Sequence, residues 1–315
     1  MNTSSSPTVL LPGGGGTAAI CALKSLRLAN FQGKIVSTDA DPLSPGFFLA
    51  DAYATLPPIS DPQFFPQALE VIEREKISLI LPTSGFDILV YSKHKAELAR
   101  RGVTVIVSDP EALENCIDKW KFYQLTHERF PMPRSTLDPR AIGEFPCFVK
   151  PVRGKGSRGI ALCRNAEELA EQVAKQKDLL IQEYLPGEEY SIDVLSDLDG
   201  NPIVAVPRVR LATKEGISVK GRVFHDAAIQ ETCLALARFL NLQGPSCMQM
   251  RRAADGTVKF LEVNPRMGGG TIFATLAGAN FAQLQIELAA GRAVQVPTFR
   301  DITVLRYYEE VVLEG

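Results

Sequence analysis

The sequence has few residues of the kinds that build zinc centres or disulfide frameworks. Its 315 residues include only three histidines, which are isolated from one another, and six cysteines, none of which form a C-x-x-C pair. Zinc sites need clustered cysteine and histidine ligands, so this scarcity argues against a zinc centre. The cysteines lie in apolar stretches, which predicts small buried thiols in a reducing compartment.

The sequence also lacks a long apolar run and an excess of charge of one sign. No stretch approaches the ~20 apolar residues that a membrane-spanning helix needs. The serine-rich start has no basic residue of the kind that opens a secretory signal. The formal net charge of -2 offers no polybasic surface for nucleic acid. We therefore expect a cytoplasmic protein whose partners include neither nucleic acid nor a membrane.

What remains is a chain of ordinary globular composition, with 45% apolar and 22% charged residues. Strand and helix patterns alternate over its first third. Such alternation predicts a parallel sheet with helices on both faces, and we expect this α/β unit to end near residue 109. Its expected strands are residues 8–11, 34–38, 78–81 and 103–107, and its expected helices are residues 17–28, 66–75 and 91–101.

The rest of the chain predicts two further units of mixed α+β type, at residues 110–199 and 200–315. A helix is expected to begin at Pro110 and to carry Asp118 and Lys119, and Asn165 with Glu168 resembles a capping box at the start of another. The other expected helices are residues 226–240 and 271–290, and the expected strands are residues 145–150, 160–163, 179–184, 190–196, 203–209, 246–251 and 258–263.

A run of four glycines, residues 13–16, follows the first expected strand and opens the first helix. Glycines at such a place let helix N–H groups approach a phosphate. The run does not fit G-x-G-x-x-G, and a tight strand-to-helix turn explains it equally well. Asp39 lies at a distance that suits a ribose ligand, which leaves a nicotinamide-dependent oxidoreductase as one alternative.

The second half holds a denser group of polar motifs. Lys150 ends a strand and is followed by residues 153–159, a turn with three glycines and three cations, which can fold over a polyphosphate. Further on, Glu262 and Asn264 are two apart on an expected strand and therefore share a face. Their oxygens, with that of Gln249 on the preceding strand, suit Mg²⁺. Arg266 follows, where charge would develop on a transferring phosphoryl group.

These motifs together resemble the ATP-grasp superfamily, and in particular proteins similar to the large subunit of carbamoyl-phosphate synthase. The resemblance rests on Asp118-Lys119, on Phe-Val-Lys-Pro at residues 148–151 with its glycine loop, on residues 182–189, and on Glu-Val-Asn-Pro-Arg at residues 262–266. It covers essentially the whole chain. It implies a pre-ATP-grasp α/β domain at residues 1–109, an ATP-grasp small subdomain with a linking helix at 110–199, and a C-terminal subdomain at 200–315.

The resemblance also implies roles for individual residues. Gln249, Glu262 and Asn264 would bind Mg²⁺, for which Mn²⁺ can substitute. Catalytic roles fall to Arg266, Lys150, Arg208 and Arg210. The substrate carboxylate pocket would be lined by residues 216–218 and 268–271, with residues 83–87 contributing to an acceptor pocket. The residues implied to contact ATP are Lys119, Lys150, Gly154, Lys155, Gly156, Ser157, Gly159, Gln182, Glu183, Tyr184, Leu185 and Glu189.

The activity implied is an ATP-dependent carboxylate–amine, or carboxylate–thiol, ligase. Its acyl-phosphate intermediate would be formed from a small-molecule carboxylate and passed to an amine, with release of ADP and phosphate. Carbamoyl phosphate synthesis itself is not expected, because the chain holds one grasp unit whereas that reaction uses two phosphorylations. The alternative is a non-catalytic or partner-dependent ATP-binding subunit of a split enzyme. The resemblance is compatible with a homodimer.

Overall fold

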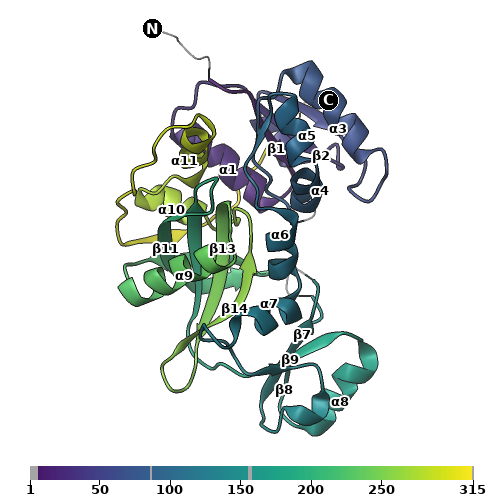
Figure 1. The fold of residues 1–315 in the computed structure, drawn as a ribbon, viewed down its shortest axis with the longest axis vertical. Helices are drawn as coiled ribbons and strands as arrows, with labels where there is room; N and C mark the ends of the chain where they lie inside the picture. The colour runs from purple at the N-terminus through teal and green to yellow at the C-terminus, as the bar shows by residue number, and fades with distance from the viewer. Residues whose placement is uncertain (1–5, 86, 155–157, 314–315) are drawn as a thin grey trace.

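The computed structural model describes residues 6–85, 87–154 and 158–313. Its helices and strands form three sheets with their covering helices, arranged along the long axis of the molecule (Figure 1). The N-terminal sheet lies at one end, the small sheet at the other, and the largest sheet between them. The fold class predicted from the sequence, a parallel α/β unit followed by antiparallel α+β units, is confirmed.

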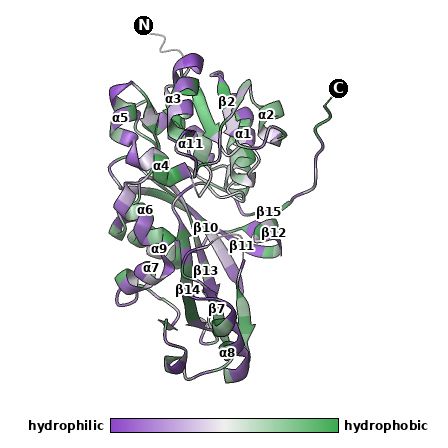
Figure 2. Cartoon of the chain, turned by 90° about the vertical axis from the view of Figure 1, so that its right-hand side faces the viewer, coloured by the Kyte–Doolittle hydropathy of each residue, from purple (hydrophilic) through white to green (hydrophobic). Residues whose placement is uncertain are grey.

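The N-terminal sheet has five parallel strands in the order β3-β2-β1-β4-β5. Val9 and Leu11 of β1 point toward α1, whereas Leu10 between them packs in the cluster formed with α3, so both faces are covered. Figure 2 shows hydrophobic strand segments within this layer, and β2 contributes Ile35 and Val36 to them. The elements are β1 (Val9–Pro12), α1 (Thr17–Leu28), β2 (Ile35–Asp39), α2 (Pro45–Leu49), β3 (Ala52–Thr55), α3 (Phe64–Glu75), β4 (Leu79–Ile80), α4 (Asp87–Lys93), α5 (Lys95–Arg100) and β5 (Thr104–Val105).

Two helices, α6 (Pro110–Ile117) and α7 (Lys119–Thr126), lead to the small antiparallel sheet, in the order β6-β9-β7-β8. One face of this sheet packs on α8 through Leu169. The predicted Asn165 cap is present, because Glu168 N donates to Asn165 Oδ1 at 2.9 Å. The return bond differs from a capping box, because the Glu168 carboxylate accepts from Arg164 N at 2.8 Å and not from the N–H of Asn165. The elements are β6 (Ser135–Thr136), η1 (Pro139–Ala141), β7 (Cys147–Pro151), β8 (Ala161–Cys163), α8 (Ala166–Lys175) and β9 (Leu179–Glu183).

The largest sheet has six antiparallel strands in the order β14-β13-β10-β11-β12-β15. Helix α9 covers one face through Ile229, Cys233 and Leu236. The elements are β10 (Glu189–Ser196), β11 (Pro202–Lys214), β12 (Ile217–Val223), α9 (Ala227–Phe239), β13 (Gly244–Arg252), β14 (Val258–Asn264), α10 (Ile272–Ala277), α11 (Phe281–Ala289) and β15 (Ile302–Leu305).

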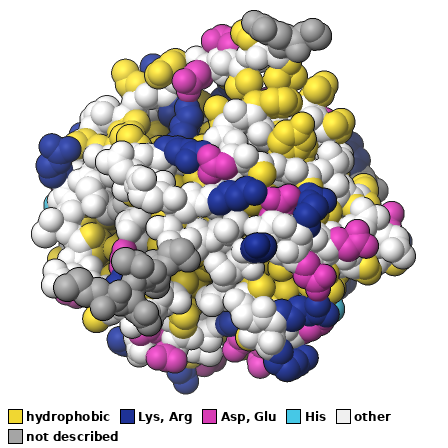
Figure 3. All heavy atoms as spheres, turned by 90° about the horizontal axis from the view of Figure 1, so that it is seen from above, with side chains coloured by type: hydrophobic (Ala, Val, Ile, Leu, Met, Phe, Trp, Pro, Cys, Tyr) yellow, Lys and Arg dark blue, Asp and Glu magenta, His cyan; other side chains and the backbone are white. Residues whose placement is uncertain are grey.

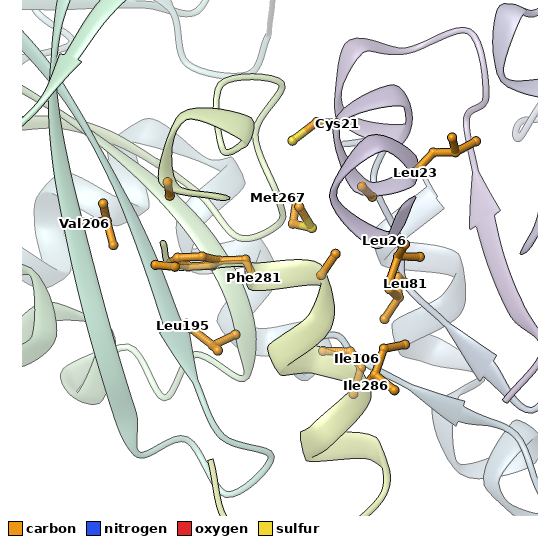
Figure 4. Close-up of a cluster of buried hydrophobic side chains, with 14 of the residues drawn as sticks. Cys21, Leu23, Leu26, Leu81, Ile106, Leu195, Val206, Met267, Phe281 and Ile286 are labelled. Carbon is orange, nitrogen blue, oxygen red and sulfur yellow. The ribbon is translucent and has the colours of Figure 1, made fainter. Parts of the chain in front are cut away.

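The N-terminal sheet and the largest sheet share one hydrophobic core. Figure 4 shows Phe281 and Ile286 of α11 between Leu195 and Val206 of the largest sheet on one side and α1 on the other. Each of these side chains is at most 4% exposed. Burial of large apolar side chains stabilises a fold by roughly 1.5–3 kcal/mol each. Helix α11 therefore joins the two sheets into one packed body.

Several boundaries differ from the sequence predictions. The expected helix from Pro110 through Lys119 is two helices, because Asp118 adopts extended angles and caps α7. The expected helix over 91–101 begins earlier, at Asp87, and breaks at His94. The expected closing helix over 271–290 breaks at Gly278, whose φ of 124° does not suit a helix. The predictions missed four strands and one helix, namely β3, β6, β12, β15 and α2.

The strand predicted at residues 190–196 was assigned to the small unit, but it is β10 and pairs with β11 and β13 within the largest sheet. The change from one sheet to the next therefore falls between Glu183 and Glu189. All six cysteines are free and buried, as predicted. No described helix is long and apolar enough to cross a membrane.

Candidate nucleotide and substrate site

The face of the largest sheet that lies opposite α9 has an apolar half and a polar half. Along β10, Tyr190, Ile192 and Val194 pack in the core beneath α9, so Glu189 and Ser191 face the opposite way. On that opposite face, Leu195 and its partners pack against α11 and α1. The strand pairing extends the polar half to Arg208, Arg210, Gln249, Arg251, Glu262 and Asn264.

The predicted metal ligands lie side by side on this polar half. Gln249 of β13 pairs directly with Glu262 of β14, and Asn264 lies two residues further along the same strand. Asn264 Nδ2 donates to Glu262 Oε1 at 3.0 Å. All three residues are half-buried, so their oxygens are not enclosed by the core. The donor set is one carboxylate and two amides, which are oxygen ligands of the kind Mg²⁺ prefers.

Lys150 reaches from the small sheet to the strand that carries these ligands. Its Nζ donates to the Leu261 carbonyl oxygen at 2.9 Å, and the residue is only 6% exposed. Burial lowers the pKa of Lys150 to about 8, and the charge of Lys119 acts in the same direction. The Glu262 and Glu189 carboxylates oppose this shift. The structure therefore gathers two lysines and two carboxylates between the small sheet and the largest sheet.

Lys119 is held at the start of α7, where Asp118 caps the helix. Asp118 Oδ1 accepts from the backbone N–H of Trp120 at 3.1 Å, and Asp118 Oδ2 accepts from Arg153 Nε at 3.2 Å. The buried Lys119 side chain donates to the Gly154 carbonyl oxygen at 3.0 Å. The Asp-Lys pair therefore fixes the start of the predicted glycine loop. Within that loop, Lys155, Gly156 and Ser157 lie outside the described residues, and Gly159 has a φ of 69°.

The segment implied to contact ATP begins in the last two residues of β9, Gln182 and Glu183, whose side chains bond within the protein. Gln182 is buried and donates to Ser135 Oγ at 2.8 Å. Glu183 accepts from the Arg134 backbone N–H at 3.0 Å and forms an ion pair with Lys259 of β14. Tyr184 is half-buried, and Leu185 is 4% exposed.

Glu189, implied to contact ATP, and Arg210, implied to be catalytic, form an ion pair with each other on neighbouring strands. Arg251 lies on the other side of Glu189, with Nη1 4.0 Å from its carboxylate. Arg210 Nη2 also donates to the Gly216 carbonyl oxygen at 2.6 Å, which ties the tip of the β11–β12 hairpin to the sheet. The two predicted residues are thus brought together by the fold.

The Arg208 side chain is enclosed by the protein. Its exposed fraction is 3%, and its Nε donates to Asp193 Oδ2 at 3.1 Å. Nη1 donates to Ser218 Oγ at 3.1 Å, while Nη2 lies 3.7 Å from Cys247 Sγ. The other Asp193 oxygen accepts from Thr271 Oγ1 at 2.7 Å. This is a paired, hydrogen-bonded buried charge, the form in which a buried ion is tolerated.

The loop after the predicted metal ligands packs around this ion pair. Gly268 N donates to the Thr271 hydroxyl at 3.0 Å, and a Cβ on Gly270 would lie 2.6 Å from Arg208 Nη2. Arg266 donates to the Met267 carbonyl oxygen at 2.8 Å. Its Nε would be 3.6 Å from a Cβ on Gly85 of the N-terminal domain. Two of the segments predicted to line the pockets, 268–271 and 83–87, are thereby placed next to the sheet, although residue 86 lies outside the described residues.

The four-glycine turn is closed by bonds within the protein. Asp39 Oδ2 accepts from Gly15 N at 2.7 Å, and Asp39 Oδ1 accepts from Asp41 N at 3.1 Å. A Cβ on Gly14 would lie 2.3 Å from Ser37 Oγ, so this glycine is required by close packing. Residues 13–16 therefore form a tight strand-to-helix turn, which was one of the two interpretations of the glycine run; the other was a phosphate-binding loop.

Sequence reasoning missed two residues that organise the site, Asp193 and Lys259, and it did not reveal that Thr271, predicted to line the substrate pocket, is the partner of Asp193. Asp193 is a lone acid in an apolar strand, flanked by Ile192 and Val194. An ionisable residue is costly to bury unless it is paired, so its position in β10 was the available signal. No cluster of three or more histidine, cysteine, aspartate or glutamate side chains that could hold a metal occurs among the described residues.

Comparison with protein families gives two matches. Residues 175–311 match the family described as ATP-grasp in the biosynthetic pathway with Ter operon, and residues 9–106 match the PylC-like N-terminal domain. The two matches lie on separate parts of the chain and together account for most of it.

Solved structures with the same fold share little sequence with this chain. A biotin carboxylase from Campylobacter jejuni has a TM-score of 0.74 and 17% identity, covering 95% of this chain and 75% of its own. N5-carboxyaminoimidazole synthetase from Staphylococcus aureus, solved with ADP, has a TM-score of 0.73 and 15% identity, covering 96% and 82%. The biotin carboxylase domain of Hydrogenobacter thermophilus 2-oxoglutarate carboxylase, solved with MgADP and bicarbonate, has a TM-score of 0.71 and 17% identity, covering 91% and 70%.

Proposed function

We propose that this chain is an ATP-dependent ligase of the ATP-grasp kind, which activates a carboxylate as an acyl phosphate and passes it to an amine; the match of residues 175–311 to an ATP-grasp family supports this. The observation that carries the proposal is the contact between Lys150 and the Leu261 carbonyl oxygen. It brings a lysine of the small sheet to the strand of Glu262 and Asn264. Cations from one side and oxygen ligands from the other are what a metal–polyphosphate complex needs.

ATP would bind between the small sheet and the polar half of the largest sheet. Lys119 and Lys150 would supply charge for the phosphates, and Gly154, where the predicted glycine loop begins, accepts from Lys119. Because the side chains of Gln182 and Glu183 are bonded within the protein, the segment through Leu185 would offer the base mainly its backbone. Glu189 would accept from ribose hydroxyls after exchanging part of its contact with Arg210.

Gln249, Glu262 and Asn264 would hold Mg²⁺, and their donor types and adjacency fit that ion. When bound, such an ion would neutralise the charge of the phosphates. Mn²⁺ accepts the same oxygen ligands and would substitute.

In the first step a carboxylate oxygen of the substrate attacks the γ-phosphorus, and ADP leaves. Arg266, which has no carboxylate partner among the described side chains, would balance charge on the transferring group. The amine nitrogen then attacks the acyl carbon, phosphate leaves, and the nitrogen gives up a proton. Positioning and charge neutralisation account for catalysis without a side-chain nucleophile. Arg208 would act by holding the pocket wall, since its guanidinium is enclosed.

A thiol acceptor in place of the amine would use the same activated intermediate. The second candidate, a partner-dependent ATP-binding subunit, would share the nucleotide site but lack a substrate pocket of its own. The contacts of Arg266 and residues 268–271 with the N-terminal domain favour a pocket within this chain.

The test is Mg²⁺-dependent release of ADP and phosphate over a panel of carboxylates and amines, offered singly and in pairs. Hydroxylamine added with a single carboxylate would trap an acyl phosphate as a hydroxamate. Glu262→Ala should abolish release, while Glu231→Ala, an exposed acid on α9 at the other face, should not. ATP binding without release for any pair would favour the partner-dependent subunit, and a failure to bind ATP would refute both.

A further inference from the structure

The C-terminal strand brings an arginine to the substrate side of the largest sheet. Strand β15 pairs with β12, and the next residue, Arg306, donates its backbone N–H to the Val219 carbonyl oxygen at 2.9 Å. Its guanidinium Nη1 lies 3.5 Å from the Ser218 carbonyl oxygen. Ser218 is the residue whose hydroxyl accepts from Arg208. Ser218 therefore lies between Arg306 and the buried Arg208–Asp193 ion pair and contacts both arginines.

The bend of the β11–β12 hairpin explains this proximity. Ser218 pairs with Thr213, five residues beyond Arg208 along β11, yet its hydroxyl returns to the Arg208 guanidinium. Two register shifts lie between Arg210 and Thr213. Such irregularities bend a strand pair, so the hairpin curls back over the sheet and carries the Arg306 contact with it.

Among the described residues, Arg306 has no counter-charge. It is half-buried, and no carboxylate of the described residues lies within 4.0 Å of its guanidinium. The Asp193 carboxylate is already shared between Arg208 and Thr271. The Cys21 thiol of α1 is nearby, but burial raises its pKa to about 12, so it carries no charge at neutral pH. The three ionised groups Arg208, Asp193 and Arg306 thus leave one positive charge unbalanced.

A half-buried cation without a partner is costly unless a ligand completes it. Burial holds the pKa of Arg306 below its usual value, and the positive charge of Arg208 acts in the same direction. The protonated form of Arg306 is therefore destabilised in the protein relative to water. The weak contact with a neutral carbonyl at 3.5 Å does not offset the charge. A bound anion in contact with the guanidinium would offset this charge.

We propose that Arg306 is an anion subsite of the substrate pocket and that it binds a second carboxylate, one that is not activated. This inference rests on the ligase function proposed above and narrows its substrates. The metal ligands are on β13 and β14, at the opposite edge of the sheet from β12 and β15. The activated carboxylate must meet the γ-phosphate at the edge formed by β13 and β14. Arg306, at the edge formed by β12 and β15, would therefore bind a different group. That group belongs either to an amino-acid acceptor or to a dicarboxylate donor.

The experiment compares acids with their uncharged analogues. Alanine, aspartate and lysine would be paired with their α-amides, and succinate and glutarate with their monoamides. Binding to the full chain in the presence of ADP and Mg²⁺ would be measured by calorimetry, and KM would be measured wherever turnover occurs. The variants are Arg306→Gln and Arg306→Lys. Arg300→Gln is the matched control, because Arg300 is an exposed arginine of the same C-terminal segment.

We expect the wild-type protein to bind at least one acid about tenfold or more tightly than its amide, and the class of that acid identifies donor or acceptor. Arg306→Gln should remove this preference and raise the KM for that substrate alone. Arg306→Lys should restore part of it, and Arg300→Gln should match the wild type. An unchanged Kd for ADP in every variant shows that the fold and the nucleotide site are intact.

The subsite would be overturned by equal binding of every acid and its amide to the wild type, or by an undiminished preference in Arg306→Gln. Failure of the ligase function gives a different pattern, in which the binding preference depends on Arg306 but no pair of substrates supports ADP release. Equal turnover of an acid and its amide would support the ligase function and refute the Arg306 subsite.

Discussion

The Lys150 ammonium lies 2.9 Å from the carbonyl oxygen of Leu261, which bonds a side chain of the small sheet to the strand carrying Glu262. This single contact spans the space in which the nucleotide would bind. It also explains why Lys150 is desolvated while remaining close to two carboxylates.

Nucleotide affinity should fall as the pH rises through about 8, the pKa of Lys150. The phosphates bind the protonated lysine, so binding is strongest below that pKa and weakens above it, by up to tenfold per pH unit. Calorimetry with ADP in the absence of metal between pH 6.5 and 9.5 checks this. Lys150→Arg, which stays protonated, should flatten the profile, whereas Lys119→Arg should keep the inflection. A profile that is flat in the wild type contradicts the assignment.

Glu262→Gln should reduce Mg²⁺-dependent activity on the order of 10²-fold, because it removes the only carboxylate of the proposed ligand set. The same change should move the pH inflection of ADP binding to lower pH, since the Glu262 charge raises the pKa of Lys150. Titration of Mg²⁺ and the pH series together separate these effects. Loss of activity without a shift of the inflection would mean that Glu262 does not face Lys150 in solution.

Gly270→Ala should destabilise the fold by about 1–3 kcal/mol, because its Cβ would meet the Arg208 guanidinium at 2.6 Å. That guanidinium is held by Asp193 and Ser218 and cannot move aside freely. Gly85→Ala is the control, since its Cβ would make an ordinary contact at 3.6 Å. Urea unfolding of the two variants tests the difference, and equal stabilities would show that the loop yields easily.

Thr271→Val should cost about 1–3 kcal/mol of unfolding free energy, because it leaves one Asp193 oxygen buried without its donor. Thr271→Ser keeps the hydroxyl and should cost less. Chemical denaturation at pH 7 measures both. If the valine and serine variants were equally stable, the hydroxyl bond would not contribute to holding residues 268–271.

The order of elements and the metal-ligand strand could be predicted because each depends on local pattern. The alternation of Leu261, Glu262, Val263 and Asn264 assigns a shared face without any tertiary information. The helix break at Asp118 could not be foreseen in this way, because it depends on a side-chain cap and on the bond from Lys119 N to the Val152 carbonyl oxygen.

Long-range pairing accounts for what the sequence could not reveal. Asp193 and Arg208 meet because β10 and β11 are adjacent, and Lys259 meets Glu183 across two sheets. Strand β15 was missed because Ile302 to Leu305 is short and gains its structure from β12. Figure 3 shows acidic and basic side chains interspersed over the N-terminal end, as the small net charge leads one to expect.

The alternation along β10 has a consequence for how this protein can change in evolution. A single-residue insertion or deletion within Glu189–Ser196 would reverse the alternation on one side of the change. If it fell between Ile192 and Asp193, for example, the residues on one side of it would exchange the polar half for the layer beneath α9. Length variation among descendants of this chain is therefore expected to accumulate in turns such as residues 197–201, while β10 tolerates substitution far better than any change in length.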